Sequence, residues 1–380
     1  MKKEIGYCLP SQDLREYIKQ RRIDVDYNEE TEKRIQTNSY EPTIGTCCYW
    51  LDDEIATFLR SNTTQPIEEA LKEIPRHKKK KFDISQGFIL NVGHSYLFPL
   101  NERIKLEDDE YVKISPKSSI GRTFLDVRAF AEKNPCSDIV HPRYSGKEYV
   151  KLWLLVHPQK FNVVVKPGLS MNQLRIFKGV GARLSRKELV EEFEKRPFLK
   201  NREGKPYDAF ITEDGVVVHV CLTSRNQRKK LKNLKVERGD CILLFTDEIF
   251  DLPAHINAEM RAYSLTNIRG PLHFAGFFDN GFRGDGVIEL MSEEKGSFLL
   301  SNKSPIAEFD FYRTRVIPDK IYGDEKSGSN YAGQHGPRMP KYFKPIATND
   351  LIALRAKKTP LAIDLSKKHF YEVDEFFEII

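Results

Sequence analysis

Residues 1–82 mix short apolar stretches with polar ones. Apolar residues recur at helical spacing after Ser11, which predicts a helix with Ser11 as its cap that ends near Arg21. A second short helix is predicted over residues 67–74, ending before Pro75. This part of the chain is therefore predicted to be a mixed, partly helical N-terminal segment.

From residue 83 the pattern changes to short runs rich in Val, Ile, Phe and Tyr, separated by Gly, Pro and Asn. Strands at this spacing are typical of an all-β sandwich or barrel. Residues 181–235 interrupt the pattern, because Ser185 and Glu188 form a capping box that predicts a helix ending near Arg196. The clearest predicted strands are 87–90, 96–100, 149–156 and 161–165.

The β pattern contains a weak internal repeat. Residues 93–98 match 239–244 at an offset of 239 − 93 = 146, and residues 171–178 match 306–313 at an offset of 306 − 171 = 135. We interpret these matches as two related β domains; the alternative is two unrelated β stretches. The predicted organisation is an N-terminal segment (1–82), a first β domain (83–180), a helical or loop connector (181–235), a second β domain with a closing tail (236–345) and a C-terminal extension of unknown role (346–380).

The charge is mildly basic, with a net +6 from 61 basic and 55 acidic residues. This balance fits anionic ligands but is too weak to indicate nucleic acid, and no strand shows the aromatic and basic face that nucleic-acid binding needs. The basic runs 76–81 and 225–232 are typical of solvated loops. No nucleic-acid partner is therefore expected.

The six cysteines include no CxxC pair, so neither a zinc ribbon nor a redox motif is predicted, and no residue is expected to bind a metal ion. Reduced thiols favour a cytoplasmic location. The start of the chain leads into no apolar segment, so no signal peptide is expected. No stretch approaches the roughly 20 apolar residues that span a bilayer, so no membrane partner is expected.

The first candidate for chemistry is residues 117–122, which contain Lys117, Ser118, Ser119 and Arg122. A phosphate group needs several donors that converge on one point, and Arg adds a planar fork. The alternative is a polar turn with a capping serine. Spacing alone leaves both readings open.

The second candidate is Glu289, a single carboxylate in the apolar run 286–291. In a strand it shares one face with Val287 and Met291. If that face points inward, desolvation raises the pKa of the carboxyl group, which suits a general base near neutrality. The pattern alone favours the alternative, with Glu289 in water.

Each copy of the repeat holds half of this chemistry. At the position of Glu289 in the second copy, the first copy has Leu154 or Leu155. At the position of the Ser-Ser-x-x-Arg element of the first copy (residues 118–122), the second copy has residues 262–269. A third candidate, a Gly-rich stretch with Tyr322, Tyr331 and Gln334, is predicted either to close over a ligand or to be a linker.

Residues 116–122, residues 278–284 followed by Glu289, and the tail from Tyr322 to Gln334 together resemble the dCTP deaminase family of the trimeric dUTPase-like superfamily. The long bacterial form, with two such domains in one chain, is the most similar, and residues 9–12 also resemble it. The resemblance spans most of residues 1–345, and the last 35 residues match nothing recognisable.

This resemblance implies a mainly β fold of two tandem dUTPase-like distorted β-barrel (jelly-roll-like) domains with a few short helices. It implies a homo-oligomer with a threefold or pseudo-threefold domain arrangement and sites between domains. The family's residue roles fall as follows: Glu289, Arg122 and Ser118 are catalytic, and Lys117, Ser119, Asp279, Phe282, Tyr322, Tyr331 and Gln334 bind the nucleotide.

The resemblance also implies hydrolytic deamination of dCTP to dUTP and ammonia, with Mg²⁺ carried by the triphosphate and no zinc. The sequence agrees, because it lacks the HxE and PCxxC pair of zinc deaminases. Since each copy lacks one half of the site, one composite site per chain is expected. The alternatives are a dUTP pyrophosphatase, alone or bifunctional with deamination, and a non-catalytic nucleotide-binding or regulatory assembly.

Overall fold

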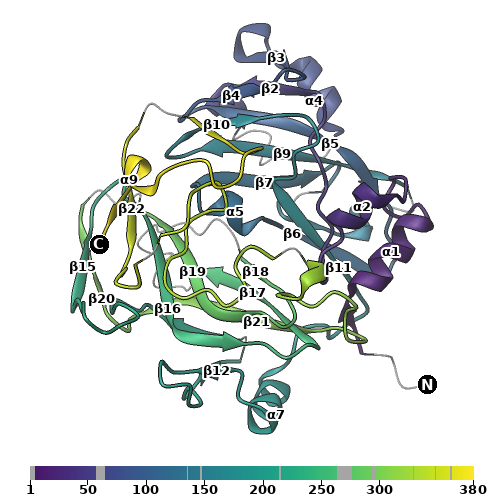
Figure 1. Ribbon diagram of the computed structural model, residues 1–380. Coiled ribbons are helices and arrows are strands. Elements are labelled where there is room, and N and C mark those ends of the chain that lie inside the picture. Colours follow the sequence, from purple (N-terminus) through teal and green to yellow (C-terminus); the bar gives the residue numbers. More distant parts are fainter. Residues whose placement is uncertain are drawn as a thin grey trace.

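The computed structural model describes residues 5–56, 65–134, 136–145, 148–213, 215–262, 276–292, 296–327, 329–346, 348–359 and 362–380. Figure 1 shows two groups of β-strands, a blue-to-teal group from the first half of the chain and a green group from the second. The yellow C-terminal segment runs alongside both groups.

The first domain contains three sheets, of which the largest has five strands in the order β3-β2-β5-β9-β7. These strands are β3 (Lys79–Asp83), β2 (Cys47–Leu51), β5 (Ser95–Ile104), β9 (Val150–Pro158) and β7 (Leu125–Ala131). The second sheet has the order β1 (Tyr7–Cys8), β11 (Asn172–Lys178), β6 (Glu110–Pro116) and β8 (Ile139–Val140). The third consists of β4 (Phe88–Leu90), β10 (Asn162–Val165) and β23 (Ala362–Asp364).

The second domain repeats this layered arrangement. One sheet consists of β12 (Leu199–Lys200), β16 (Cys241–Asp251), β22 (Leu354–Ala356) and β24 (Phe377–Ile379), and β19 (Arg283–Met291) also pairs with β16. The opposing sheet has the order β13 (Phe210–Ile211), β14 (Val216–His219), β21 (Pro305–Arg313), β17 (Ile256–Ala262) and β18 (Phe277–Phe278). The strands β15 (Asn233–Val236) and β20 (Phe298–Ser301) form a separate pair.

The helices are short. They are α1 (Ser11–Lys19), α2 (Glu29–Arg34), α4 (Ile67–Glu73), α5 (Ser118–Gly121), α6 (Pro142–Ser145), α7 (Arg186–Lys195) and α9 (Val373–Phe376), with 3-10 turns η1 (Arg76–Lys78) and η2 (Glu325–Ser327). Among the described residues, no helix has the length and apolar character needed to cross a membrane.

The helix ends test two sequence predictions. The capping box of α7 is confirmed, because the Ser185 hydroxyl accepts from the Glu188 N–H and the Glu188 carboxylate accepts from the Ser185 N–H at 2.8 Å. The cap of α1 differs from the prediction. Pro10 occupies the cap position and Ser11 is the first helical residue, with its hydroxyl bonded to Asp319.

The two domains share an irregularity at equivalent positions. The pairing of β5 with β9 shifts between Pro99 and Arg103, and that of β16 with β19 shifts between Phe245 and Ile249. Both pairs differ by 146 (245 − 99 and 249 − 103), the offset seen in the sequence. The pairing also decides which leucine corresponds to Glu289. Leu97 pairs with Leu155, and its counterpart Leu243 (243 − 97 = 146) pairs with Glu289, so Leu155 is the equivalent residue.

The N-terminal segment is not separate from the first domain, which differs from the predicted boundary at residue 82. Strand β2 lies between β3 and β5, and Leu14 and Tyr40 are buried in the same core as β9. Apolar spacing could not show this, because the partners of β2 follow much later in the chain. The predicted connector differs in the same way, since β14 pairs with β21 inside the second domain.

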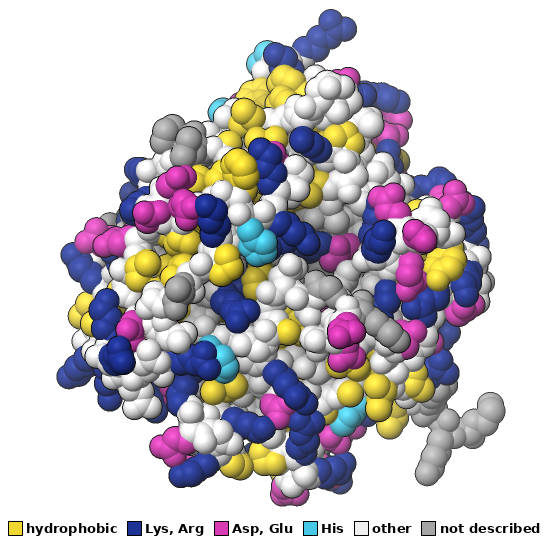
Figure 2. All heavy atoms as spheres, in the orientation of Figure 1, with side chains coloured by type: hydrophobic (Ala, Val, Ile, Leu, Met, Phe, Trp, Pro, Cys, Tyr) yellow, Lys and Arg dark blue, Asp and Glu magenta, His cyan; other side chains and the backbone are white. Residues whose placement is uncertain are grey.

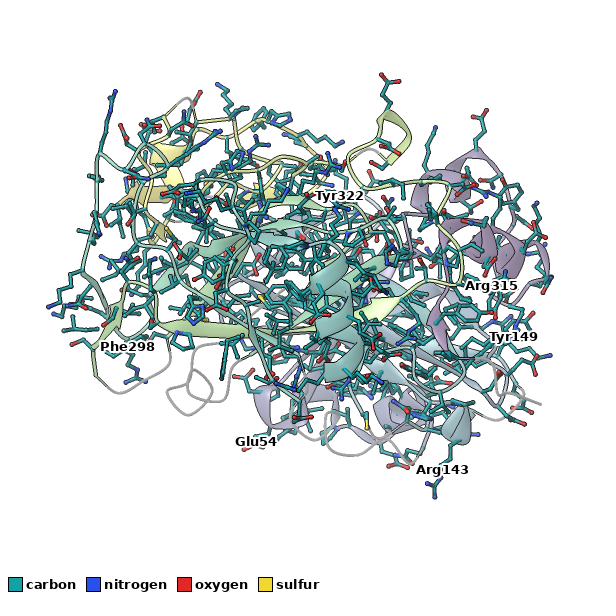
Figure 3. The ribbon with its side chains drawn as sticks, turned by 90° about the horizontal axis from the view of Figure 1, so that it is seen from below. Glu54, Arg143, Tyr149, Phe298, Arg315 and Tyr322 are labelled. Atoms are coloured by element: carbon teal, nitrogen blue, oxygen red, sulfur yellow. The ribbon has the colours of Figure 1, made fainter. Side chains whose placement is uncertain are left out.

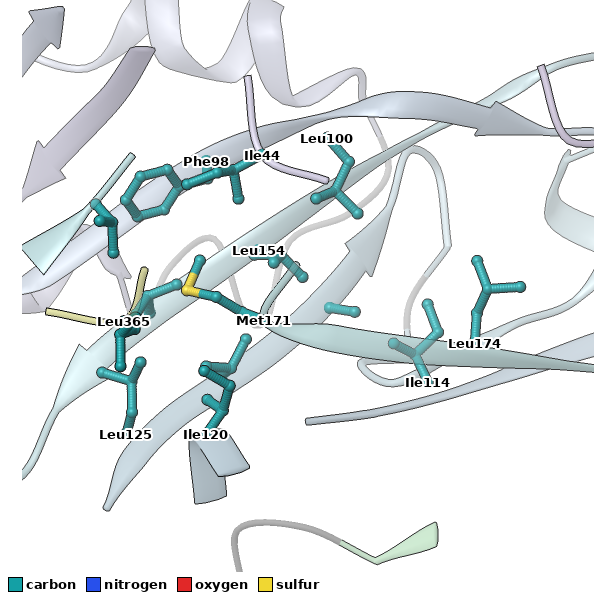
Figure 4. Close-up of a cluster of buried hydrophobic side chains, with 14 of the residues drawn as sticks. Ile44, Phe98, Leu100, Ile114, Ile120, Leu125, Leu154, Met171, Leu174 and Leu365 are labelled. Carbon is teal, nitrogen blue, oxygen red and sulfur yellow. The ribbon is translucent and has the colours of Figure 1, made fainter. Parts of the chain in front are cut away.

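The C-terminal extension joins both domains. Leu354 of β22 pairs with Leu243 of β16 in the second domain, whereas β23 pairs in parallel with β10 in the first. Figure 4 shows Leu365 of this extension in the buried cluster that also contains Leu125 and Met171 of the first domain. Residues 346–380, whose role the sequence left open, are thus part of the packed structure of both domains.

Candidate active site

A cavity of about 730 Å³ lies between the two domains and is lined by residues of both. Figure 2 shows the face of the molecule seen in Figure 1, on which basic and acidic side chains are interspersed. All the predicted site residues line this one cavity: Lys117, Ser118, Ser119, Arg122, Asp279, Phe282, Glu289, Tyr322, Tyr331 and Gln334. The sequence therefore predicted a set of residues that the fold brings together.

The phosphate-binding candidate is a single helical turn directly after a strand. Strand β6 ends at Pro116, the Lys117 N–H donates to the carbonyl of Met171 at 3.0 Å, and α5 follows. Lys117 occupies the cap position, so the alternative of a serine-capped turn does not describe this element. The turn presents Lys117, Ser118 and Ser119 to the cavity.

Arg122 is buried, with 3% of its surface exposed, and its guanidinium group holds the tail. One terminal nitrogen donates to the Gln334 side-chain oxygen and the other to the Arg338 carbonyl, both at 3.0 Å. The guanidinium carbon lies 3.8 Å from the centre of the Tyr331 ring, in cation–π geometry. These donors fix the planar fork in one orientation.

Glu289 lies on β19 and is also buried, with 2% of its surface exposed. Its Oε1 atom lies 3.9 Å from Nε of Arg122 within the same chain. The adjacent Ile288 and Leu290 pack into the core of the second domain, so both faces of the strand are covered. The expectation from the pattern alone, with Glu289 in water, is wrong because the first domain and the tail cover the second face.

The tail from Tyr322 to Gln334 is packed against both domains and is not a linker. The Tyr331 hydroxyl and the Ser119 hydroxyl form a hydrogen bond of 2.8 Å. The Gln334 amide donates to the Asp285 carbonyl at 2.6 Å, and the Asp285 N–H donates to the Gln334 carbonyl at 2.9 Å. Burial raises the pKa of Tyr331, so this hydroxyl stays protonated near neutral pH.

Gly284 permits the close approach of the tail to β19. Its φ of +130° lies outside the range that residues with a side chain readily adopt, and a Cβ there would lie 2.4 Å from the Gln334 carbonyl oxygen. A glycine at this point of the strand is therefore needed for the tail to pack as it does.

The turn from Asp279 to Phe282 forms the apolar end of the cavity. The Phe282 ring lies 5.0 Å from that of Phe278 and 5.5 Å from that of Tyr322. Figure 3 shows Tyr322 near the middle of the molecule, whereas Glu54 and Arg143 lie at its periphery. Rings in this arrangement suit the flat face of a base or the carbons of a sugar.

Arg175 does not line the cavity but supports its wall, and the sequence reasoning missed it. It is fully buried on β11, and it donates to Asp279 at 2.8 Å, to Asn257 at 3.0 Å and to the Ala258 carbonyl at 2.9 Å. It thus ties the first domain to the turn of the second domain that lines the cavity. The signal in the sequence was weak, because Arg175 stands between Leu174 and Ile176 in a stretch that also contains Asn172, Gln173 and Lys178.

The cavity also contains charged residues that had no recognisable pattern. Lys117 forms an ion pair with Glu41, and Lys341 and Lys368 line the cavity as well. Glu41, Lys341 and Lys368 lie in stretches of loop-like composition, so no periodicity could have marked them. The counterpart segment predicted in the second copy cannot be placed, since 263–269 lie outside the described residues.

Comparison with family models supports these observations. The model described as the 2′-deoxycytidine 5′-triphosphate deaminase N-terminal domain matches residues 6–180, and the model of the C-terminal domain of the same enzyme matches residues 206–343. The two matches cover most of the chain and correspond to the two β domains.

Curated relatives match over shorter stretches. A dUMP-forming dCTP deaminase of Nocardioides sp. is 35% identical over 108 residues, which is 28% of this chain and 56% of the relative. The corresponding protein of Corynebacterium glutamicum is 29% identical over 124 residues, 32% of this chain and 66% of the relative. The chain thus spans less than two thirds of the length of each of these relatives.

A solved structure has a similar fold. The 2′-deoxycytidine 5′-triphosphate deaminase of Agrobacterium tumefaciens superposes with a TM-score of 0.68 at 19% identity, covering 83% of this chain and all of that chain. The predicted fold class is confirmed in that the chain is mainly β, with two tandem β domains and a few short helices.

Proposed function

The chain belongs to the 2′-deoxycytidine 5′-triphosphate deaminase family, and on that premise we propose that it hydrolyses the C4 amino group of dCTP, giving dUTP and ammonia. The observation that carries the proposal is the position of Glu289 beside Arg122, 3.9 Å apart in the buried cavity between the domains. The first domain supplies the phosphate donors and the second supplies the carboxylate.

In the proposed reaction Glu289 acts as general base and then as general acid. The carboxylate takes a proton from the water whose oxygen attacks C4, and the ring nitrogen N3 is protonated as the tetrahedral intermediate forms. Glu289 then passes the proton of the new C4 hydroxyl to the amino group, the C4–N bond breaks as the C4=O bond forms, and ammonia leaves. Arg122, the C-cap of the turn α5, orients the Glu289 carboxylate, and Ser118, the first residue of the same turn, is the third residue proposed to be catalytic.

The nucleotide is proposed to lie with its triphosphate on the turn α5 and its base toward β19. Lys117 and Ser119 bind the phosphates, with Mg²⁺ entering as part of the magnesium nucleotide. Phe282 and Tyr322 contact the deoxyribose, and Asp279 borders the base. The tail residues Tyr331 and Gln334 close the cavity through their bonds to Ser119 and Arg122. Zinc takes no part in this proposal.

The alternatives are less well supported. The family description names deamination rather than pyrophosphate release. A non-catalytic assembly would fit domains that each lack half of the site motif, but the Ser-Ser-x-x-Arg element of the first domain and Glu289 of the second line one cavity. The curated relatives are named as dUMP-forming, and the nucleotide product, dUTP or dUMP, distinguishes deamination alone from the bifunctional alternative.

The test is incubation of the protein with Mg–dCTP, Mg–dUTP or Mg–CTP, followed by measurement of ammonia, pyrophosphate and nucleotide products. We expect ammonia and dUTP from dCTP in equal amounts and little reaction with CTP. Pyrophosphate from dUTP without ammonia from dCTP would overturn the proposal in favour of a pyrophosphatase, and binding of dCTP without any product would favour the non-catalytic alternative.

The proposal includes a homo-oligomer with threefold or pseudo-threefold domain symmetry, working in the cytoplasm. Sedimentation velocity of the purified chain tests the homo-oligomer, because the proposal predicts one assembled species and no monomer at micromolar concentration.

A further inference from the structure

Lys341 is tied to the phosphate-binding turn by a short chain of hydrogen bonds. Its backbone N–H donates to the Tyr331 hydroxyl at 3.2 Å, and that hydroxyl bonds the Ser119 hydroxyl at 2.8 Å. The next two residues, Tyr342 and Phe343, are buried in the core of the first domain, with 1% and 2% of their surface exposed. This anchoring fixes the backbone of Lys341 beside the cavity. The side chain of Lys341 forms part of the cavity wall.

Lys368 is held next to Lys341 by backbone pairing. The His369 N–H donates to the Lys341 carbonyl at 2.9 Å, and the N–H groups of Phe370 and Tyr371 donate to the Tyr342 carbonyl at 2.8 and 3.1 Å. Strand β23, just before Lys368, pairs with β10 of the first domain. Lys368 therefore lines the same end of the cavity, although it lies beyond both family domains.

Among the described groups whose charges act on Lys341, the basic side chains outnumber the acidic ones. Lys341 faces Lys117, Lys368 and Glu41, with the Tyr331 hydroxyl at its backbone, and Glu41 is already paired with Lys117. Burial, followed by the repulsion of Lys117 and Lys368, lowers the pKa of Lys341 to about 8. Within this described group, Lys341, Lys117 and Lys368 share the carboxylate of Glu41, so an added polyanion would stabilise their ammonium groups.

We propose that Lys341 and Lys368 bind the terminal phosphates of the nucleotide, so that the C-terminal segment after residue 340 completes the triphosphate site. This inference rests on the proposed function for the identity of the ligand. Lys341 supplies a second ammonium group beside Lys117, and Lys368 adds a third at the same end of the cavity.

The proposal has a consequence for pH dependence. The neutral form of Lys341 becomes common as the pH rises through about 8 in the free protein. A bound triphosphate favours the charged form, so binding takes up a proton and weakens as the pH rises through that value. Arginine at this position would stay charged and remove the dependence.

The test is isothermal titration of the full-length protein with inorganic tripolyphosphate and with Mg–dCTP at pH 7.0 and 9.0. We expect Lys341→Gln to weaken both ligands roughly 10- to 100-fold at pH 7.0, and Lys368→Gln to weaken them less. Lys341→Arg is expected to retain binding with a flatter pH dependence. The matched control is Lys344→Gln, because Lys344 lies in the same segment but pairs with Glu372 at the surface.

Unchanged tripolyphosphate affinity in folded Lys341→Gln and Lys368→Gln proteins would overturn the inference and leave the proposed deamination standing. Conversely, if the wild-type protein binds tripolyphosphate through Lys341 but releases no ammonia from dCTP, the proposed deamination is contradicted and the phosphate site at Lys341 and Lys368 is not. A thermal melt of each variant, compared with that of Lys344→Gln, distinguishes lost binding from lost folding.

Discussion

Nε of Arg122 lies 3.9 Å from Oε1 of Glu289, and both side chains are buried although they belong to different domains. Each domain alone presents only half of the chemistry, since Leu155 takes the place of Glu289 in the first. The relationship explains why one chain of two diverged domains retains a complete site. It also makes the arrangement of the two domains a condition of activity.

The first prediction concerns the carboxylate. Glu289→Gln keeps the volume of the side chain but cannot accept the proton of water, so kcat for dCTP is expected to fall by about 10²–10⁴-fold with little change in KM. Ammonia release and a thermal melt measure the two effects. Glu237→Gln is the control, because Glu237 lies on the surface of the same domain beside Lys235. Full deaminase activity in Glu289→Gln would remove the assigned role.

The second prediction concerns the approach of the tail to β19. Gly284→Ala places a Cβ 2.4 Å from the Gln334 carbonyl oxygen, so the tail is expected to lift off and kcat/KM to fall. Limited proteolysis should then cleave between Tyr331 and Arg338 faster than in the wild type.

Gly239→Ala is the matched control for this variant. Gly239 also has a positive φ, of +78°, but a Cβ there meets nothing within 4 Å. Gly239→Ala carries the cost of a left-handed φ, about 1–2 kcal/mol, without a clash, so the difference between the variants reports the φ of +130° and the close contact at Gly284. Equal tail protection in the two variants would show that the tail does not depend on Gly284.

The third prediction concerns the domain interface. Arg175→Met removes the guanidinium that Asp279, Asn257 and the Ala258 carbonyl share, leaving a largely buried carboxylate without its ion-pair partner. We expect the free energy of unfolding to fall by about 3–5 kcal/mol. Urea denaturation measures it, with Arg186→Met at the surface of α7 as control. A loss no larger than that of the control would contradict a role for Arg175 in holding the domains together.

Local signals were predictable from the sequence. The capping box at Ser185 and the strand β9 depend on residues close in the chain, and both were found as predicted. The sequence offset of 146 between the two copies is also found in the structure, where it relates the register shift in the pairing of β5 with β9 to that of β16 with β19. What the sequence missed depends on remote partners. Strand β23 has only three residues and is defined by its pairing with β10, which no local pattern reveals.

In the site, too, some features could be predicted from the sequence and others depend on partners that are distant in the chain. Its residue set followed from family resemblance, whereas the orientation of Glu289 required the first domain and the tail to cover its face of β19. Lys341 and Lys368 carried no pattern, because their position depends on backbone bonds between segments 341–344 and 369–371. The spacing of apolar residues along the chain therefore gives no sign of charged side chains that backbone bonds between distant segments bring to the cavity.

The most direct test of a complete site within each chain is complementation between two inactive variants, Arg122→Gln and Glu289→Gln. The two chains, carrying different tags, are co-expressed, purified as mixed assemblies and assayed for ammonia release from Mg–dCTP. The account predicts no activity beyond that of either variant alone, because every chain lacks one half of its own site. Recovery toward a quarter or more of wild-type activity would show that Arg122 and Glu289 meet between chains, and would contradict it.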